Sequence, residues 1–121
     1  MPVSIEREDA GVYRLDVTGV LRKSELDEVQ ETLVSELRQS GTSSVRLLVV
    51  LRAFTGWEPG VAWNDLSFYI QHGDALARIA IVGPPEWRSH ALMFAAADLR
   101  KGPVEYFPPA AMADARAWLA R

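Results

Sequence analysis

Residues 45–51 read VRLLVVL, and this run fixes how the rest of the chain is interpreted. All but one of its residues are apolar, and several are β-branched. Such a run without alternation is typical of a strand that is covered on both faces, as in the centre of a parallel sheet. The stretch ARIAIVG at 77–83 has the same character. We therefore expect two buried, neighbouring strands at the centre of one sheet.

The residues before this run predict a hairpin and then a helix. VSI at 3–5 is a short strand, and VYRLDVTGV at 12–20 alternates apolar and polar residues. Alternation with period two indicates a strand that has one wetter face. From Ser24, which can cap a helix N-terminus, to Gly41, leucine and valine recur at helical spacing. The chain therefore enters the strand at 45–51 from a helix.

The residues after it alternate between helices and strands. Pro59 suits the first turn of a helix over 59–72, and Pro-Pro pairs at 84–85 and 108–109 precede two more helices. VEYF at 104–107 is a partly exposed strand. The order β-β-α-β-α-β-α-β-α predicts an α/β fold with a mixed sheet of about five strands and flanking helices. We expect one domain over 1–121, with an antiparallel member contributed by the leading hairpin.

The composition excludes several functional classes. The chain has 121 residues, 49% apolar and 24% charged, which are ordinary globular values. It has no cysteine, so disulfides, thiolate metal sites and cysteine nucleophiles are excluded. The net charge is −3 and the cations are scattered, which argues against nucleic acid as a partner. No secretory signal or spanning apolar run is evident, so we expect a cytoplasmic protein. The two histidines are distant and no cluster of acids accompanies them, so we expect no metal, and we expect no cofactor.

A phosphate or nucleotide site is not expected. Two stretches, FTGWEPG and IVGPPEW, join a strand to a predicted helix through a glycine turn. Phosphate sites of this type use backbone amides at the helix start, but prolines occupy those positions here and have no amide hydrogen. Glu58 and Glu86 would also repel an anion. Neither stretch has the spacing of a dinucleotide or P-loop motif.

No convincing catalytic set is present. Asp65, Tyr69 and His72 fall on one face of the helix predicted over 59–72, and they could orient an imidazole. The simpler interpretation is that Asp65 and His72 form a solvated polar rim, or that His72 lies at the helix end, where a cation is favoured. We expect a protein that is not an enzyme.

The aromatic residues between 54 and 72 allow two interpretations. They can be ordinary core, with Trp57 packed back on the helix. Alternatively, Phe54 and Trp57 stand on a loop made mobile by glycines, and Phe68 faces away from the sheet. Partly exposed aromatics are typical of a subunit interface, a membrane contact or a cover over an apolar ligand. The candidate ligand-binding residues are Phe54, Trp57, Trp63, Leu66, Tyr69 and Ile70, and the candidate contacts for a partner or membrane are Trp57 and Phe68.

The central stretch resembles a known family. The pattern F-x-G-W-x-P-x-x-x-W-x-D over 54–65, with a preceding strand that closes in LVxL, is similar to the SpoIIAA-like proteins. That group is related to STAS domains and, more remotely, to CRAL-TRIO lipid carriers. The strand RIAIVG, the E-x-x-F strand and a last helix with A-x-x-W-L extend the resemblance along the chain.

The resemblance implies a cytoplasmic, non-enzymatic domain, often a homodimer, with an apolar-ligand or membrane-association role. The function it favours is binding of an apolar small molecule or lipid through a mobile, Trp-rich helix, with peripheral membrane contact. The alternative is a STAS-like regulatory domain that binds other proteins as a homodimer. STAS antagonists carry a phosphorylatable Ser or Thr in a turn that reads GWEPGVAW here. Because that turn has no hydroxyl, the alternative operates without a phospho-switch.

Overall fold

The protein forms a five-stranded mixed sheet with helices on both faces. A computed structural model describes residues 3–8, 11–40, 44–60, 76–94 and 103–121. The strands are β1 (Val3–Arg7), β2 (Val12–Leu21), β3 (Val45–Trp57), β4 (Leu76–Val82) and β5 (Val104–Phe107). The helices are α1 (Lys23–Ser40), α3 (Arg88–Phe94) and α4 (Met112–Leu119), and 3-10 turns at Pro85–Trp87 and Pro109–Ala111 precede the last two.

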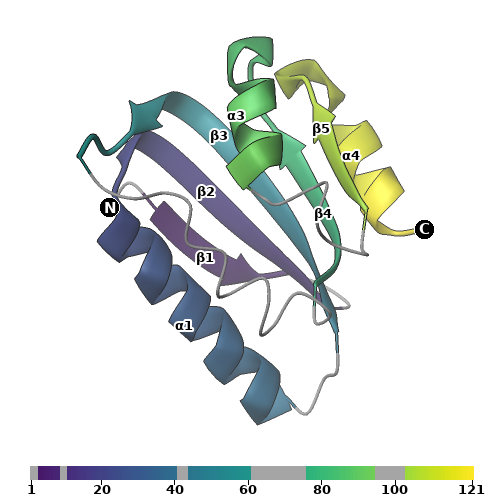
Figure 1. Cartoon of the computed structure of the whole chain (residues 1–121). Coiled ribbons are helices and arrows are strands. Elements are labelled where there is room, and N and C mark those ends of the chain that lie inside the picture. Colours follow the sequence, from purple (N-terminus) through teal and green to yellow (C-terminus); the bar gives the residue numbers. More distant parts are fainter. Residues whose placement is uncertain (1–2, 9–10, 41–43, 61–75, 95–102) are drawn as a thin grey trace.

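The strands lie in the sheet in the same order as in the sequence, β1-β2-β3-β4-β5 (Figure 1). β1 pairs antiparallel with β2, and the pairs β2–β3, β3–β4 and β4–β5 are all parallel. This confirms the α/β class, the leading hairpin and the mixed sheet of five strands that the alternation of elements predicts. The two apolar runs, β3 and β4, are neighbours inside the sheet, as expected for strands covered on both faces.

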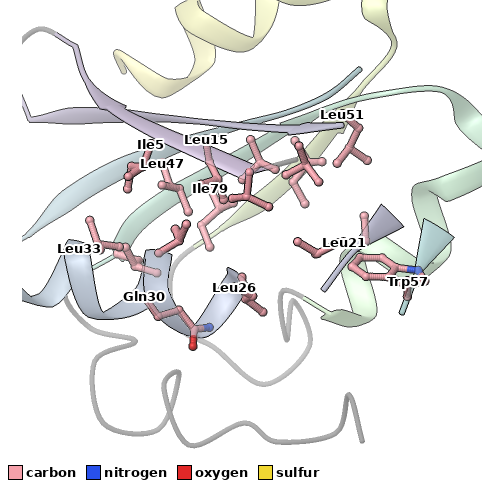
Figure 2. Close-up of a pocket in the computed structure, with 17 residues that line it drawn as sticks. Ile5, Leu15, Leu21, Leu26, Gln30, Leu33, Leu47, Leu51, Trp57 and Ile79 are labelled. Carbon is pink, nitrogen blue, oxygen red and sulfur yellow. The ribbon is translucent and has the colours of Figure 1, made fainter. Parts of the chain in front are cut away.

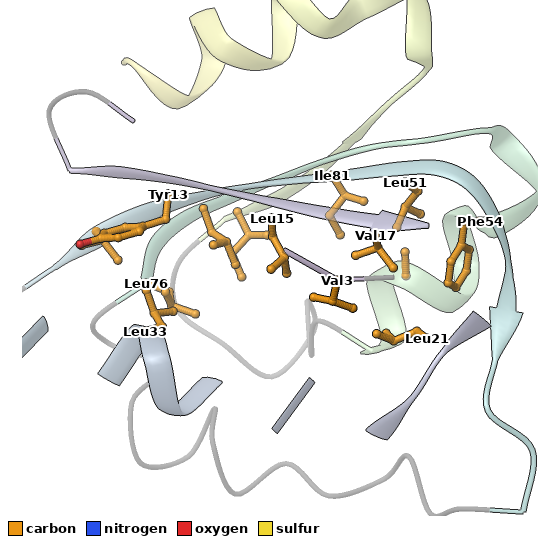
Figure 3. Packing of buried hydrophobic residues seen from close by; sticks show 14 residues of the cluster. Val3, Tyr13, Leu15, Val17, Leu21, Leu33, Leu51, Phe54, Leu76 and Ile81 are labelled. Atoms are coloured by element: carbon orange, nitrogen blue, oxygen red, sulfur yellow. The ribbon is translucent and has the colours of Figure 1, made fainter. Parts of the chain in front are cut away.

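Each central strand supplies two hydrophobic layers, because successive side chains point to opposite faces. In β3, Leu47 and Leu51 pack on the side of α1, whereas Leu48 and Val50 pack on the side of α4. Ala91 of α3 belongs to the same layer as α1. Figure 3 shows this arrangement, with α4 beyond one face of the sheet and α1 and α3 beyond the other.

We call the two layers the α1 face and the α4 face. The buried residues of the α1 face are Val3, Tyr13, Leu15, Val17, Leu21, Leu33, Val45, Leu47, Leu51, Phe54, Leu76, Ile79, Ile81 and Ala91. Those of the α4 face are Leu48, Val50, Ala80, Val82, Ala115 and Leu119. The α1 face is thus built mainly from large side chains, and the α4 face includes two alanines where helix and sheet approach each other.

Two strand arginines hold the C-terminal end of α4. The Arg46 guanidinium donates to the carbonyl of Leu119 and, at 3.3 Å, to that of Arg121. Arg78 donates to the carbonyl of Trp118 at 2.8 Å, and its guanidinium lies 5.1 Å from the centre of the Trp118 ring. The last carbonyls of a helix have no partner within the helix, so these cations satisfy them and favour the negative end of its dipole.

Three local predictions are wrong. The strand predicted to end at residue 51 continues to Trp57, because its final part pairs with the end of β2. Ser24 does not cap α1, which already begins at Lys23; the carboxylate of Glu58 accepts a hydrogen bond from the Lys23 amide at 3.2 Å instead. Pro59 lies in a turn rather than in the first turn of a helix. The remainder of the helix predicted over 59–72, and Gly41, lie outside the described residues.

Candidate functional site

A cavity of about 80 Å³ lies between α1 and the sheet, on the α1 face. It extends from the edge strand β1 to the end of β3, where Trp57 closes one end in Figure 2. The described residues that line it are Val3, Ile5, Leu15, Val17, Leu21, Leu26, Val29, Gln30, Leu33, Leu47, Val49, Leu51, Trp57, Leu76, Ile79, Ile81 and Ala91. Aliphatic side chains from β1, β2, β3 and β4 therefore form the floor of the cavity. Side chains from successive turns of α1 form its wall.

The lining is almost purely hydrocarbon. Among its described members, only Gln30 and the indole of Trp57 carry a polar side-chain atom, and none carries a charge. Gln30 is half-buried on α1, between Leu26 and Leu33 in the helical repeat, and Figure 2 shows its carboxamide pointing away from the strands. The cavity thus has an apolar interior and one neutral hydrogen-bonding group at its margin, a combination that is common in small-molecule sites.

A double irregularity at the ends of β2 and β3 shapes the Trp57 end of the cavity. Val17 pairs with Leu51, but Gly19 then pairs with Phe54, so β3 contains an extra residue. Ala53 lies in this extra stretch with a φ of 47°, a left-handed conformation that is uncommon for a residue other than glycine. A second shift follows between Gly19 and the next residue of β2. Such bulges bend a strand and change the direction of its side chains.

The bulges bring three aromatic rings into contact. Phe54 is buried and lies at the centre, with its ring 5.1 Å from that of Trp57 and 4.9 Å from that of Trp87, both in edge-to-face geometry. Trp87 also lies 6.0 Å from the ring of His90. Its indole Nε1 is buried without a hydrogen-bond partner. Gly56 lies against the same ring, since a Cβ atom there would be 3.6 Å from it.

These observations place two of the predicted site residues. Trp57 lines the cavity, and Phe54 packs behind it in the core rather than on a mobile loop; the loop assignment of both residues is wrong because they belong to β3. The other predicted ligand, contact and rim residues, Trp63, Asp65, Leu66, Phe68, Tyr69, Ile70 and His72, lie outside the described residues. Their roles stay predictions.

Sequence reasoning missed the wall of the site. It assigned α1 only as a packing helix, although Leu26, Gln30 and Leu33 follow one another at i, i+4 and i+7. A glutamine inside an apolar helical stripe is a usable signal, because buried amides need a partner. The spacing of residues also gave no indication that Trp87 lies beside Phe54. That contact depends on the bulges and has no counterpart in local spacing.

The N-terminus of α1 is not a free anion site. Glu58 already places its carboxylate at the Lys23 amide, where the helix dipole favours negative charge. The expectation that Glu58 opposes a phosphate concerned the start of the helix predicted over 59–72, most of which lies outside the described residues, so it stays a prediction. Within the described residues no group of three or more potential metal ligands occurs.

The sequence profile of the SpoIIAA-like family matches residues 12–120, which is nearly the whole chain. The chain belongs to the SpoIIAA-like family. Its fold is similar to the crystal structure of an uncharacterized protein of the DUF3478 family, with a SpoIIAA-like fold, from Shewanella loihica PV-4. That similarity has a TM-score of 0.72 and 26% sequence identity, over 97% of this chain and 91% of the other. No curated protein matches the chain.

Membership of the SpoIIAA-like family supports a regulatory or binding domain, and domains of this type are generally non-enzymatic. In this SpoIIAA-like domain, the described residues that line the apolar cavity include no acid, base or nucleophile. His90, on α3, is exposed and touches only the rim of the aromatic group. Among the described helices, none is long and apolar enough to cross a bilayer.

Proposed function

We propose that this domain binds a small apolar molecule in the cavity between α1 and the sheet. The observation that carries the proposal is the lining itself: aliphatic side chains from four strands and a helix surround an unfilled volume of about 80 Å³. Interiors of native domains are packed nearly as densely as organic crystals, with few voids larger than a water molecule. A hydrocarbon void also stays dry, so water is a poor occupant.

The volume is large enough for its filling to matter. At about 24 cal/mol per Å³, the slope for cavities made by truncating core side chains, an enclosed void of about 80 Å³ would correspond to about 2 kcal/mol of packing free energy. A ligand that fills it recovers part of that free energy as contact and burial. Since a cavity of about 150 Å³ accommodates benzene or xenon, this smaller one fits a compact ligand. A lipid chain would enter only by its tip unless the walls move apart.

Xenon is a suitable first probe, because it is apolar, small and free of directional bonding. In methyl-resolved NMR spectra under xenon pressure, we expect the largest shifts at Leu33, Leu47 and Ile79, whose methyl groups surround the void. Ala91→Leu adds carbon atoms at the cavity wall and should weaken those shifts. Ala113→Leu adds the same atoms to an exposed position of α4 and should leave them unchanged. Equal, unstructured shifts across the whole chain would refute the proposal.

Lipid binding and peripheral membrane association are the more specific forms of this proposal. The apolar lining supports the first, and Trp57, at the end of the cavity, supplies the reporter for both. Intrinsic tryptophan fluorescence measured with neutral and anionic vesicles should shift if the domain takes up lipid. Trp57→Phe identifies the part of the signal that comes from the cavity, and Trp118→Phe, on the α4 face, is the matched control.

A regulatory protein-interaction role as a homodimer is the second candidate, and family membership favours it. Val20 at the end of β2 and Met93 on α3 are large apolar side chains that are exposed in the single chain. Sedimentation equilibrium at several loading concentrations tests this candidate directly. A monomer at every concentration would exclude the homodimer, and a dimer that Val20→Lys or Met93→Lys dissociates would support it.

A further inference from the structure

The chemistry of the cavity restricts the charge of its ligand. Pockets for fatty acids and other carboxylates bury a hydrocarbon body and need a cation or several hydrogen-bond donors for the head group. Here no described lining residue is charged, and the polar side-chain atoms in the described lining are those of Gln30 and Trp57.

The helix that forms the wall is acidic. Over its length α1 carries five acidic residues and two basic ones, and Asp27, an exposed acid, lies one turn before Gln30. The nearer of the two bases, Lys23, contacts Asp27 at 3.3 Å. Glu25 in the first turn lies 4.0 Å from the Arg22 guanidinium, and its buried Oε1 atom accepts no hydrogen bond. The cations at this end of α1 thus already lie beside acidic side chains, so a further carboxylate would lack a counter-ion of its own.

We propose that the cavity selects uncharged ligands: a compact hydrocarbon body with at most one neutral hydrogen-bonding group, which the half-buried Gln30 side chain at the margin meets after a change of rotamer, and no carboxylate. This inference rests on the proposed binding function and adds the ligand class to it. The carboxamide of Gln30 can donate to a carbonyl, ether or hydroxyl group and can accept from a hydroxyl. It offers a carboxylate no compensating charge.

The size of the discrimination follows from protonation. A carboxylic acid with a pKa of about 4.3 is neutral in roughly one molecule of 500 at pH 7. If only the neutral form enters, its apparent affinity at pH 7 is about 500-fold lower than that of an isosteric neutral ligand. The apparent affinity then rises about tenfold for each pH unit by which the solution is made more acidic, as long as the pH stays above that pKa.

Isobutyrate and 3-methylbutan-2-one form the matched pair, because a carboxylate oxygen replaces a methyl group in molecules of nearly equal shape. Both are titrated into the whole chain and followed at the methyl groups of Leu33, Leu47 and Ile79 by NMR at pH 7 and pH 6. We expect the ketone to bind equally at both pH values. We expect isobutyrate to bind at least 100-fold more weakly at pH 7 and to gain about tenfold at pH 6.

Variants at Gln30 test the position of the head group. Gln30→Lys places an ammonium at the margin of the cavity, where a lysine can extend toward solvent, and should allow isobutyrate to bind at pH 7. Gln30→Met keeps the length without the charge and should leave the discrimination in place. Because Gln30 is half-buried, both substitutions are compatible with the fold.

The outcomes separate this inference from the proposed function. If isobutyrate and the ketone bind alike at pH 7, the selection for uncharged ligands is overturned and the binding function stands. If Gln30→Lys gains no affinity for isobutyrate, the head-group position is overturned. If neither probe perturbs the cavity methyl groups and xenon also fails to do so, the binding function falls, and the inference with it.

Discussion

Substitution of Gly83, the residue that follows β4, gives the sharpest test of the packing. A Cβ atom built at Gly83 would lie 2.7 Å from the Tyr106 hydroxyl and 3.0 and 3.1 Å from two carbon atoms of Leu51. Gly83 is not among the residues with positive φ, so alanine meets no backbone strain there. The contacts alone therefore determine the effect of Gly83→Ala. We expect it to destabilise the fold.

The magnitude follows from two terms. Overpacking of a close-packed site costs about 1–3 kcal/mol. The hydroxyl of Tyr106, which donates to the carbonyl of Pro84, must also move, and the loss of such a hydrogen bond costs about 1 kcal/mol. Gly83→Ala should therefore lower the free energy of unfolding by about 2–4 kcal/mol. Urea unfolding followed by far-UV circular dichroism measures this difference.

A double-mutant cycle identifies the cause. Tyr106→Phe removes the hydroxyl that a Cβ at position 83 would strike, and alone it should cost about 1 kcal/mol. Combined with Gly83→Ala, it should cost about 1–2 kcal/mol less than the sum of the single effects, because the worst contact no longer exists. Strict additivity of the two substitutions would refute this reasoning, and so would a Gly83→Ala variant as stable as the parent.

Three further predictions concern residues away from the cavity. The hydrogen bond from Arg116, at 2.6 Å, holds the pKa of Glu8 below its usual 4.5. The stability that this pair contributes is therefore present above pH 4.5 and is lost as the pH falls below it. In urea unfolding, Glu8→Gln should be less stable than the parent by under about 1 kcal/mol at pH 7 and equally stable at pH 3. Arg78→Ala should cost about 1–3 kcal/mol in chemical unfolding, since it removes a hydrogen bond and a ring contact from Trp118. Ala53→Gly should raise the melting temperature slightly. The substitution relieves about 1–2 kcal/mol of strain from the left-handed backbone of Ala53, and this exceeds the entropic cost of a glycine, which is about 0.5–1 kcal/mol.

The sheet could be predicted from the sequence because its signals are local. The apolar run of β3 and the alternation of β2 each determine how many faces of the strand are covered, and the proline and glycine residues mark where elements change. The register and the strand ends could not be predicted in this way. β3 continues past residue 51 only because the end of β2 pairs with it through two shifts, and such pairing between residues distant in sequence has no local signature.

The candidate site was predicted only in part for the same reason. The aromatic pattern singled out Phe54 and Trp57, and the structure brings their rings together at one end of the cavity, while their role in binding stays a prediction. The contribution of α1 was missed, because a helix with one apolar stripe is the ordinary expectation for any amphipathic helix. A cavity remains between the helix and the sheet only when the two lie far enough apart. The spacing of apolar residues along the helix does not determine that distance.

The two faces of the sheet differ in how closely a helix approaches them. On the α4 face, Ala80 and Ala115 are fully buried and Leu48 is inaccessible to solvent, so small side chains let the helix approach closely. The α1 face has the larger residues and yet retains the cavity. A hollow of about 120 Å³ also lies on the α4 side, but it sits at the margin of α4 and is lined by the charged side chains of Glu8 and Arg116 as well as by Val12, Leu119 and Ala120. The hollow beneath α1 differs in its lining, which is hydrocarbon from four strands and a helix, and this difference supports the proposed binding site on the α1 face.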